Sequence, residues 1–264
     1  MTHLSPLIRT NSEGVSILKL SNAVGRNPLS AALLNELTSE LHAIAGDTDI
    51  RAVIIAADGP VFSAGHDLKE MSAYRMEADK GRASFAAILG RCATLMQLIT
   101  KLPQPVIAAV EGVATAAGCQ LVASCDLAVA GAEARFCTPG VHIGLFCSTP
   151  MVALTRTMSP KHAMEMLLLG DMVDVETAYR FGLVNRVVTA GNALAEAKRM
   201  AGVIASKSSV AVKIGKQAFY QQNEMNLADA YAYASTIMVD NMLERDAVEG
   251  IGAFVEKRDP VWER

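Results

Sequence analysis

Short, wholly apolar runs recur along the chain, and they limit the possible fold more than any other feature. They occupy residues 52–57 (AVIIAA) and 106–110 (VIAAV), and residues 126–130 (DLAVA) form a similar run that begins with one aspartate. Runs of this length are typical of strands that are buried on both faces. A strand, a loop and a helix-like segment repeat several times along the chain. This repetition predicts an α/β fold built from successive turns.

Helix-like sequence separates these runs and then dominates the second half of the chain. Residues 31–45 place leucine and isoleucine at three- and four-residue spacing, which predicts a helix with one apolar stripe. A last short strand is predicted at residues 184–188, and no strand pattern follows Asn192. We therefore predict two domains, a core of residues 1–195 and a C-terminal helical domain of residues 196–264.

The composition excludes several classes of protein. Hydrophobic residues make up 51% of the 264 residues, which is enough for a large buried core and excludes a disordered chain. The 24 lysines and arginines balance 27 aspartates and glutamates, and the net charge is −3, with no block of like charge. We therefore expect no nucleic-acid partner and no membrane partner.

The five cysteines lie in apolar sequence and form no CxxC pair: Cys92, Cys119, Cys125, Cys137 and Cys147. We interpret them as buried, reduced thiols and expect neither a metal site nor a disulfide framework. The first ten residues lack a basic region followed by an apolar stretch, and the apolar runs elsewhere are too short to span a bilayer. These observations predict a cytosolic protein.

Two loops of small residues follow predicted buried strands. One spans residues 114–118, at the start of a charge-poor stretch, residues 112–150, and the other surrounds Gly65 and His66. Small residues between a strand and a helix leave backbone N–H groups accessible to a ligand. A pair of such donors is what acyl-transfer and enolate chemistry needs, because it stabilises a negatively charged carbonyl oxygen.

Short motifs that resemble one known family are spread over nearly the whole chain. They are Phe62–Met71 (FSAGHDLKEM), Pro105–Gly112 (PVIAAVEG), Gly118–Cys119, Cys125–Asp126, Phe136, Pro139, Gly144, Ala163–Met166, Gly170, Ala178, Gly182–Val184 and Phe254–Arg258. Together they resemble the enoyl-CoA hydratase/isomerase, or crotonase, superfamily. Residues 114–129 and 138–150 are similar in particular to its enoyl-CoA hydratase domain-containing protein 3 group.

The resemblance implies a spiral of ββα turns and a C-terminal helical domain that assembles trimers or dimers of trimers. It also implies that the ligand is an acyl-CoA thioester, with no further cofactor. The two backbone N–H groups of the superfamily's oxyanion hole fall on His66 and Ala117. Its coenzyme A contacts fall on Arg26, Ala64, Gly65, His66, Leu68 and Lys69 and, from a neighbouring subunit, on Phe254 and Lys257.

Two positions depart from the pattern of the hydratases that this chain resembles. Those enzymes carry one glutamate just after the Gly-Cys pair that corresponds to Gly118–Cys119. They carry another just after the proline that precedes the Gly144 region. Gln120 and Gly140 occupy these positions here. A carboxamide takes no proton at neutral pH and glycine has no side chain, so the usual acid and base are absent. We expect inefficient hydration, and a higher rate when both glutamates are restored.

Other side chains are candidates for proton transfer. His66 is the strongest, because imidazole titrates near neutrality and a histidine here also resembles methylmalonyl-CoA decarboxylase. Alternatively, His66 only shapes the loop. Gln120 either holds a water or substrate oxygen or satisfies buried partners. His142 is a candidate for the pocket or a core histidine, and Cys119 and Cys147 are nucleophiles or inert thiols.

Three hypotheses for the function remain open. The first is an enzyme, a lyase or isomerase of fatty acid metabolism with His66, Ala117 and Gln120 as catalytic residues; the reaction is hydration, isomerisation or decarboxylation. The second is a catalytically inactive acyl-CoA-binding or regulatory protein. The third is a structural subunit of a trimer.

Overall fold

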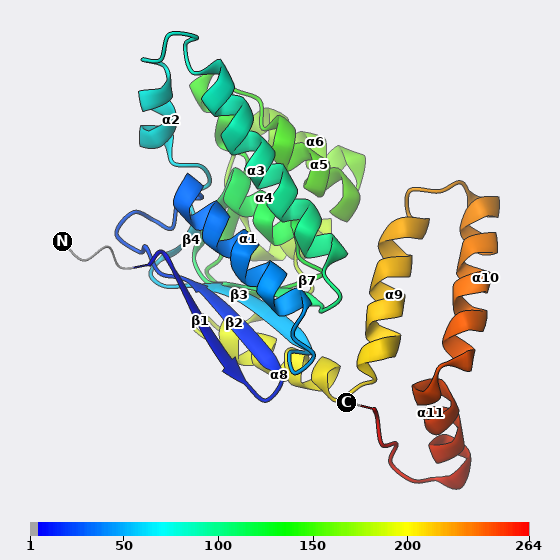
Figure 1. Cartoon of the computed structure of the whole chain (residues 1–264). Coiled ribbons are helices and arrows are strands. Elements are labelled where there is room, and N and C mark those ends of the chain that lie inside the picture. Colours follow the sequence, from blue (N-terminus) through cyan, green and yellow to red (C-terminus); the bar gives the residue numbers. More distant parts are fainter. Residues whose placement is uncertain (1–4, 264) are drawn as a thin grey trace.

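The strands form two sheets (Figure 1). The computed structural model describes residues 5–263. The larger sheet has six strands in the order β1 (Leu7–Ser12), β2 (Val15–Leu20), β3 (Ala52–Ala57), β5 (Val106–Val110), β7 (Leu127–Gly131) and β10 (Arg186–Val188). The smaller sheet has four, in the order β4 (Val61–Ser63), β6 (Val113–Thr115), β8 (Arg135–Cys137) and β9 (Val173–Asp174). Neighbouring strands are parallel except β1 with β2 and β8 with β9.

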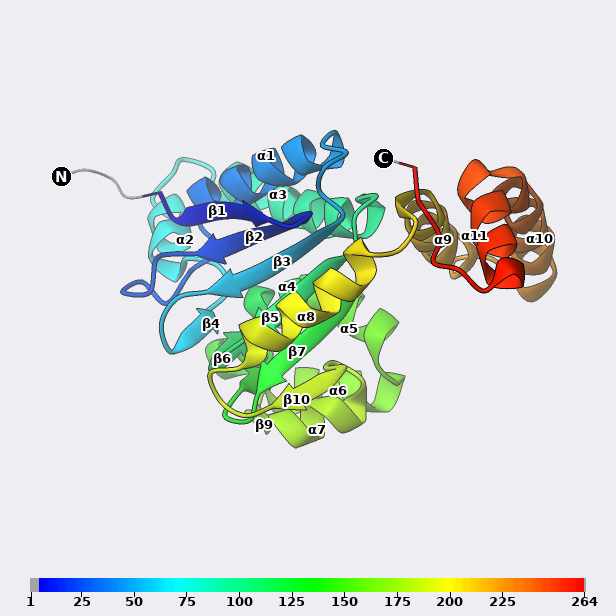
Figure 2. The same cartoon turned by 90° about the horizontal axis from the view of Figure 1, so that it is seen from below.

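The strands β3 and β5 are apolar at every position because helices cover both faces of the larger sheet. Val53 belongs to the core beneath α1 (Ala31–Ala45) and α3 (Arg82–Lys101), whereas its neighbour Ile54 packs on the side of α8 (Ala193–Ala205). Figure 2 shows α1 and α3 on one face of this sheet and α8 on the other. Successive side chains of a strand point to opposite faces, so both sets of side chains in β3 and β5 are buried.

A repeating unit of one strand in each sheet followed by helix builds the core. The units are β3 and β4 with α2 (Leu68–Tyr74) and α3, β5 and β6 with α4 (Ala117–Ser124), and β7 and β8 with the 3-10 helix η1 (Pro139–Ile143) and α5 (Ser148–Thr157). Two further helices of the core, α6 (Pro160–Leu169) and α7 (Val175–Phe181), follow α5 in the chain. The predicted α/β fold of ββα turns is confirmed.

Beyond the sheets, the chain forms an arm of three helices, α9 (Ser209–Gln222), α10 (Leu227–Leu243) and α11 (Arg245–Glu256) (Figures 1 and 2). The predicted division between residues 195 and 196 falls inside α8. This helix buries three alanines, at positions 193, 197 and 201, against the larger sheet, so the arm begins after α8. The division into two domains stays a prediction, and residues 1–4 and 264 of those domains lie outside the described residues.

A buried cluster attaches the arm to the sheets. Lys216 of α9 donates from Nζ to a carboxylate oxygen of Asp126 at 2.7 Å and to the carbonyls of Ile99 and Gln104 at 2.9 and 3.0 Å. The Tyr220 hydroxyl donates to the other oxygen of Asp126 at 2.9 Å. Only 6% of the Lys216 side chain is exposed. All three ammonium hydrogens therefore have protein acceptors.

Helix α3 is the one helix in the described part of the chain that is long and apolar enough to cross a membrane. Five of its side chains are buried in the main core: Ile88, Cys92, Leu95, Met96 and Ile99. A core helix of a globular protein can have this length and composition as well. No membrane role follows from α3.

Candidate functional site

The two small-residue loops are in contact at two glycines. A Cβ on Gly118 would lie 2.8 Å from the Cβ of Ser63 and 2.9 Å from the Ser63 carbonyl carbon. A Cβ on Gly65 would lie 3.0 Å from the Cβ of Ala116 and 3.1 Å from the Ala117 nitrogen. Gly65 also has a φ of +82°, where residues with a side chain are strained. The small residues in both loops therefore permit this close approach.

The contact brings the backbone N–H groups of His66 and Ala117 close together. Neither group donates a hydrogen bond to another described residue. Other bonds fix the loop around Gly65 and His66. The Ala64 N–H donates to the carbonyl of Arg26 at 3.0 Å, and the Thr115 hydroxyl donates to the carbonyl of Ala64 at 3.0 Å. Two free donors on fixed loops can hold one oxygen that carries negative charge.

The backbone of Ala116 is strained at this point. Its φ is +50° and its ψ is −118°, a conformation that residues other than glycine rarely adopt. Such strain costs on the order of 1–3 kcal/mol and persists where the surroundings enforce it. The Ala116 N–H donates to the carbonyl of Cys137 at 2.9 Å, and its carbonyl accepts from the Gln120 N–H at 3.0 Å. These bonds set the direction of the next N–H group, which belongs to Ala117.

The His66 imidazole is held at one nitrogen and free at the other. Nδ1 lies 3.3 Å from the carbonyl oxygen of Leu29, and the Leu29 N–H donates to the carbonyl of Gly65 at 2.8 Å. A carbonyl only accepts, so Nδ1 carries the proton and Nε2 has the lone pair. Nε2 is buried and has no hydrogen-bond partner among the described residues. Burial lowers the pKa of His66, although the bond to Leu29 opposes this effect, so Nε2 is a free base at neutral pH.

Gln120 lies one helical turn after Ala117, and its side chain is buried. The Gln120 side-chain oxygen lies 4.0 Å from Sγ of Cys92 on α3. Burial raises the pKa of Cys92 to about 12, so Cys92 stays a thiol and acts as a weak donor to this oxygen. The carboxamide can donate a hydrogen bond from its nitrogen, but it offers no base.

Gly140 has little room for a side chain. A Cβ there would lie 2.9 Å from Sγ of Cys147 and 3.0 Å from the carbonyl oxygen of Leu145. Contacts this short require the neighbours to move. The expected gain in rate from restoring both glutamates therefore conflicts with the packing at Gly140, because Cys147 already lies against the position of the first side-chain atom.

The other predicted side chains give no further reactive group. All five cysteines are free and buried, as predicted. Burial raises the pKa of Cys119, Cys147 and Cys137, the last to about 11, so these thiols stay protonated near neutral pH. His142 is exposed, with Nε2 against Gly170, and is therefore not a buried core histidine. The described residues contain no cluster of three potential metal ligands.

The predicted coenzyme A contacts fall into two separate groups. Arg26, Leu68 and Lys69 are exposed near the His66 loop, where Ala64 and Gly65 also lie. Phe254, which is 83% exposed, and Lys257 lie at the end of α11. Figure 1 shows α11 and α2 at opposite ends of the molecule. A single chain therefore does not bring the two groups together.

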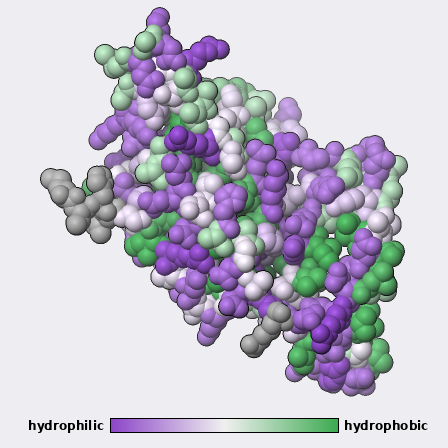
Figure 3. Space-filling model, in the orientation of Figure 1, coloured by the Kyte–Doolittle hydropathy of each residue, from purple (hydrophilic) through white to green (hydrophobic). Residues whose placement is uncertain are grey.

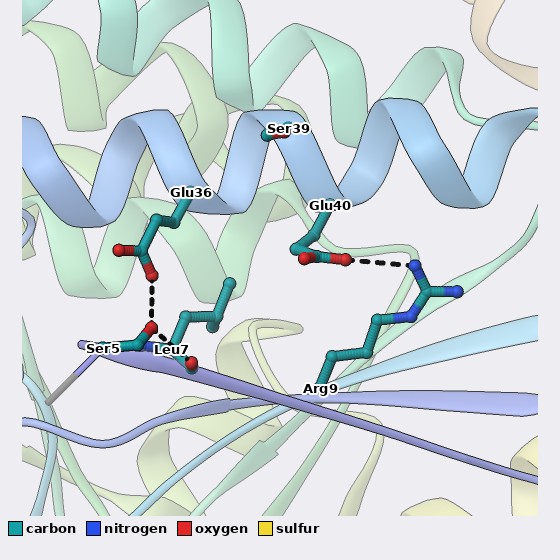
Figure 4. A pocket seen from close by; sticks show the side chains of 6 residues that line it. All are labelled: Ser5, Leu7, Arg9, Glu36, Ser39 and Glu40. Carbon is teal, nitrogen blue, oxygen red and sulfur yellow. Dashed lines mark hydrogen bonds and ion pairs between the residues drawn. The ribbon is translucent and has the colours of Figure 1, made fainter.

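A polar depression of about 250 Å³ lies elsewhere, between β1 and α1 (Figure 4). The Ser5 hydroxyl donates to Glu36 at 2.6 Å, and Arg9 pairs with Glu40 at 3.0 Å. These two contacts fasten the edge of the sheet to α1, and they occupy the charged side chains that line the depression. It is not a second candidate for the site.

Two contributors to the site carry no recognisable sequence signal. Leu29 acts through its carbonyl oxygen, which every residue type possesses. Cys147 matters because it fills the space beside Gly140. The turn residues Asn27 and Pro28 mark the loop before Leu29, but they do not indicate that its carbonyl reaches His66.

A known protein family matches nearly the whole chain. Residues 10–264 match the sequence model of the enoyl-CoA hydratase/isomerase family. The chain belongs to this family. Two mammalian family members, from rat and human, are named enoyl-CoA hydratase domain-containing protein 3, mitochondrial. The rat protein is 47% identical over 95% of this chain and 82% of its own length. The human protein is 46% identical over 95% of this chain and 81% of its own length.

Solved structures of the family are similar over nearly the whole chain. The crystal structure of human enoyl coenzyme A hydratase domain-containing protein 3 has a TM-score of 0.92 at 46% identity and covers 97% of this chain and 100% of that chain. A crystal structure of an enoyl-CoA hydratase from Mycobacterium smegmatis has the same TM-score and identity and covers 97% and 98%. The resemblance to the domain-containing protein 3 group is therefore confirmed.

The prediction of a cytosolic protein is wrong. The similar proteins from rat, mouse, human and Xenopus laevis are all named as mitochondrial. The prediction relied on the lack of a basic region followed by an apolar stretch. That pattern marks secretory signals, whereas mitochondrial transit peptides are amphipathic and rich in arginine and serine. Its absence therefore says nothing about mitochondria.

Proposed function

We propose that this family member binds an acyl-CoA thioester and stabilises the enolate of that thioester with the backbone N–H groups of His66 and Ala117. The observation that carries the proposal is that these groups lie on loops in contact and donate to no described residue. A thioester oxygen gains negative charge as the enolate forms. Donors aimed at it therefore stabilise the transition state more than the ground state. Arg26, Leu68 and Lys69 contact the coenzyme A moiety in this proposal.

In the same proposal, His66 moves the substrate proton. Its Nε2 atom is unprotonated and unpartnered, and it belongs to the residue whose N–H group holds the oxygen. A base in this position accepts a proton while the charge it leaves behind is stabilised nearby. Gln120 supplies a hydrogen bond to a substrate oxygen or a water, because its carboxamide cannot act as a base.

Replacing His66 by alanine is expected to lower kcat by on the order of 10²–10⁴-fold, the usual contribution of a general base. KM should change little, because the backbone N–H group is retained. In the unmodified protein the rate should rise with pH as Nε2 loses its proton, and this rise should occur below the ordinary imidazole pKa of 6.5, because burial lowers the pKa of His66. Steady-state kinetics between pH 4 and 8 measure both effects.

His42→Ala is the matched control, because His42 is exposed on α1 and belongs to no part of the site. Full turnover by His66→Ala would contradict the role of His66. A rate that falls as the pH rises through this range would also contradict it.

Hydration, isomerisation and decarboxylation of acyl-CoA thioesters all pass through an enolate, and the proposal leaves the choice among them to a substrate panel. Gln120 and Gly140 argue against water addition by a pair of carboxylates. Assays with a 2-enoyl-CoA, a 3-enoyl-CoA and a malonyl-type CoA identify the reaction from its product. Hydration or decarboxylation of a fatty acyl-CoA would make the enzyme a lyase, and movement of the double bond would make it an isomerase. Hydration at the rate of glutamate-bearing relatives would contradict our expectation.

A second candidate function is acyl-CoA binding without catalysis. The observation that favours it is the same pair, Gln120 and Gly140, together with the packing of Cys147 against Gly140. Calorimetry with the same thioesters separates the candidates. Tight binding with no turnover on any member of the panel supports the binding protein, turnover supports the enzyme, and no binding contradicts both.

We propose that the arm assembles the chain into trimers or dimers of trimers. Support comes from α10 and α11, which expose large apolar side chains: Leu227, Tyr231, Met238, Val239, Met242, Leu243, Val248, Ile251, Phe254 and Val255. Figure 3 shows hydrophobic residues on the arm. Contiguous exposed apolar surface is typical of an interface. A neighbouring subunit would then supply Phe254 and Lys257 to the site. Sedimentation velocity should give three or six times the mass of one chain, and a monomer at micromolar concentration would contradict the proposal.

A further inference from the structure

We propose that Glu70 is a positioning residue for His66. Its carboxylate holds the segment whose carbonyl fixes the imidazole, and it stabilises the imidazolium that forms when Nε2 accepts a proton. The inference rests on the proposed role of His66 and adds a second residue to it.

The Glu70 carboxylate joins two helices. One oxygen, Oε2, accepts from the backbone N–H of Ala31, the first residue of α1, at 3.1 Å. The other, Oε1, accepts from the Tyr74 hydroxyl at 2.8 Å. The Glu70 N–H in turn donates to Asp67, the N-cap of α2, at 3.2 Å. The carboxylate therefore has little freedom, and it ties the start of α1 to α2.

The segment that Glu70 fixes is the one that orients the imidazole. Leu29 lies two residues before Ala31, and its carbonyl accepts from Nδ1 of His66 at 3.3 Å. The Leu29 N–H donates to Gly65 at 2.8 Å, next to His66 in the chain. A displacement of Ala31 would therefore move the carbonyl that keeps the proton on Nδ1 and the lone pair on Nε2.

Glu70 also supplies a charge. The segments packed around His66 carry the charged side chains of Arg26, Asp67, Lys69 and Glu70, and residues 115–117 carry none. Of these charges, the carboxylate of Glu70 is the one that raises the pKa of His66, against the larger lowering effect of burial. A nearby carboxylate stabilises an imidazolium, as the aspartate of a catalytic triad does. Here the tasks are divided, since the Leu29 carbonyl fixes the tautomer and Glu70 provides the charge.

Two substitutions separate this role from a structural one. Glu70→Gln keeps an oxygen acceptor for the Ala31 N–H and removes the charge. We expect kcat to fall by about tenfold, the loss typical of one charge-assisted interaction, with KM unchanged. The pKa of His66, followed by NMR of its ring protons, should fall, and the acid limb of the pH–rate profile should move to lower pH. Glu70→Ala removes acceptor and charge together, so it should lower kcat further and also lower Tm.

If Glu70 serves only as a cap for α1, Glu70→Gln will match the unmodified protein in kcat and in the pKa of His66, while Glu70→Ala is impaired. That result overturns the inference. Glu165→Gln, an equivalent change at an exposed position of α6, is the control and should leave both quantities unchanged. The NMR measurement does not depend on turnover. A failure of the proposed function, seen as full turnover by His66→Ala, therefore remains distinguishable from a failure of the role of Glu70.

Discussion

Replacing Lys216 by methionine is expected to lower the free energy of unfolding by about 3–5 kcal/mol, because removing one partner of a buried ion pair leaves the other charge uncompensated. The substitution leaves Asp126 with only the Val106 N–H and the Tyr220 hydroxyl as hydrogen-bond donors. It also removes the donor to the carbonyls of Ile99 and Gln104. Equilibrium unfolding in urea, followed by circular dichroism, measures the change.

Lys213→Met is the matched control, since Lys213 is exposed on the same helix and should change stability by less than about 0.5 kcal/mol. The loss should be specific to the ion pair. Asp126→Asn and the double variant therefore complete a cycle, in which the two single losses should not add. A loss below about 1 kcal/mol in Lys216→Met would show that the cluster is not what attaches the arm.

Replacing Gly118 by alanine is expected to lower the rate of acyl-CoA turnover by on the order of 10²–10³-fold, the cost of losing one oxyanion donor. The new methyl group would meet Ser63 at 2.8 Å and push the start of α4 away from β4. The Ala117 N–H would then move away from that of His66. We also expect a loss of about 1–3 kcal/mol in stability from overpacking. Kinetics and thermal unfolding of the same preparation measure the two effects.

Gly215→Ala is the control for Gly118→Ala. Gly215 lies within α9, and a Cβ there would meet nothing within 4 Å. Alanine should therefore stabilise the protein by about 0.5–1 kcal/mol through helix propensity and leave turnover unchanged. Turnover by Gly118→Ala at the unmodified rate would contradict the assignment of Ala117 to the oxyanion hole.

The larger sheet could be predicted from the sequence because burial on both faces leaves a strong pattern. The strands β3 and β5 coincide with the predicted apolar runs, and β7 is displaced from its prediction by one residue. The smaller sheet left no such pattern, because its strands contain only two or three residues, too few for a period to be recognised. The edge strand β1 (LIRTNS) was missed because most of it is polar.

The candidate site was predictable where it depends on small residues and unpredictable where it depends on distant contacts. Gly65 and Gly118 mark places where two backbones approach closely, and the resemblance to the family assigned their neighbours to the oxyanion hole. The contact between His66 and Leu29 spans 37 positions of the chain and uses a carbonyl. The packing of Cys147 against Gly140 likewise depends on how a loop returns on itself. Neither contact leaves a local pattern.

The proposed oxyanion donors belong to the main chain, and this has a consequence for how the family diversifies. A substitution at His66, Gln120 or Gly140 changes the groups that transfer protons, but every residue at position 66 or 117 other than proline still provides an N–H group. After gene duplication, a protein of this fold can therefore lose one reaction and acquire another. Each protein along that route still binds an acyl-CoA thioester. Selection can act on the new chemistry without first rebuilding the site that binds the thioester.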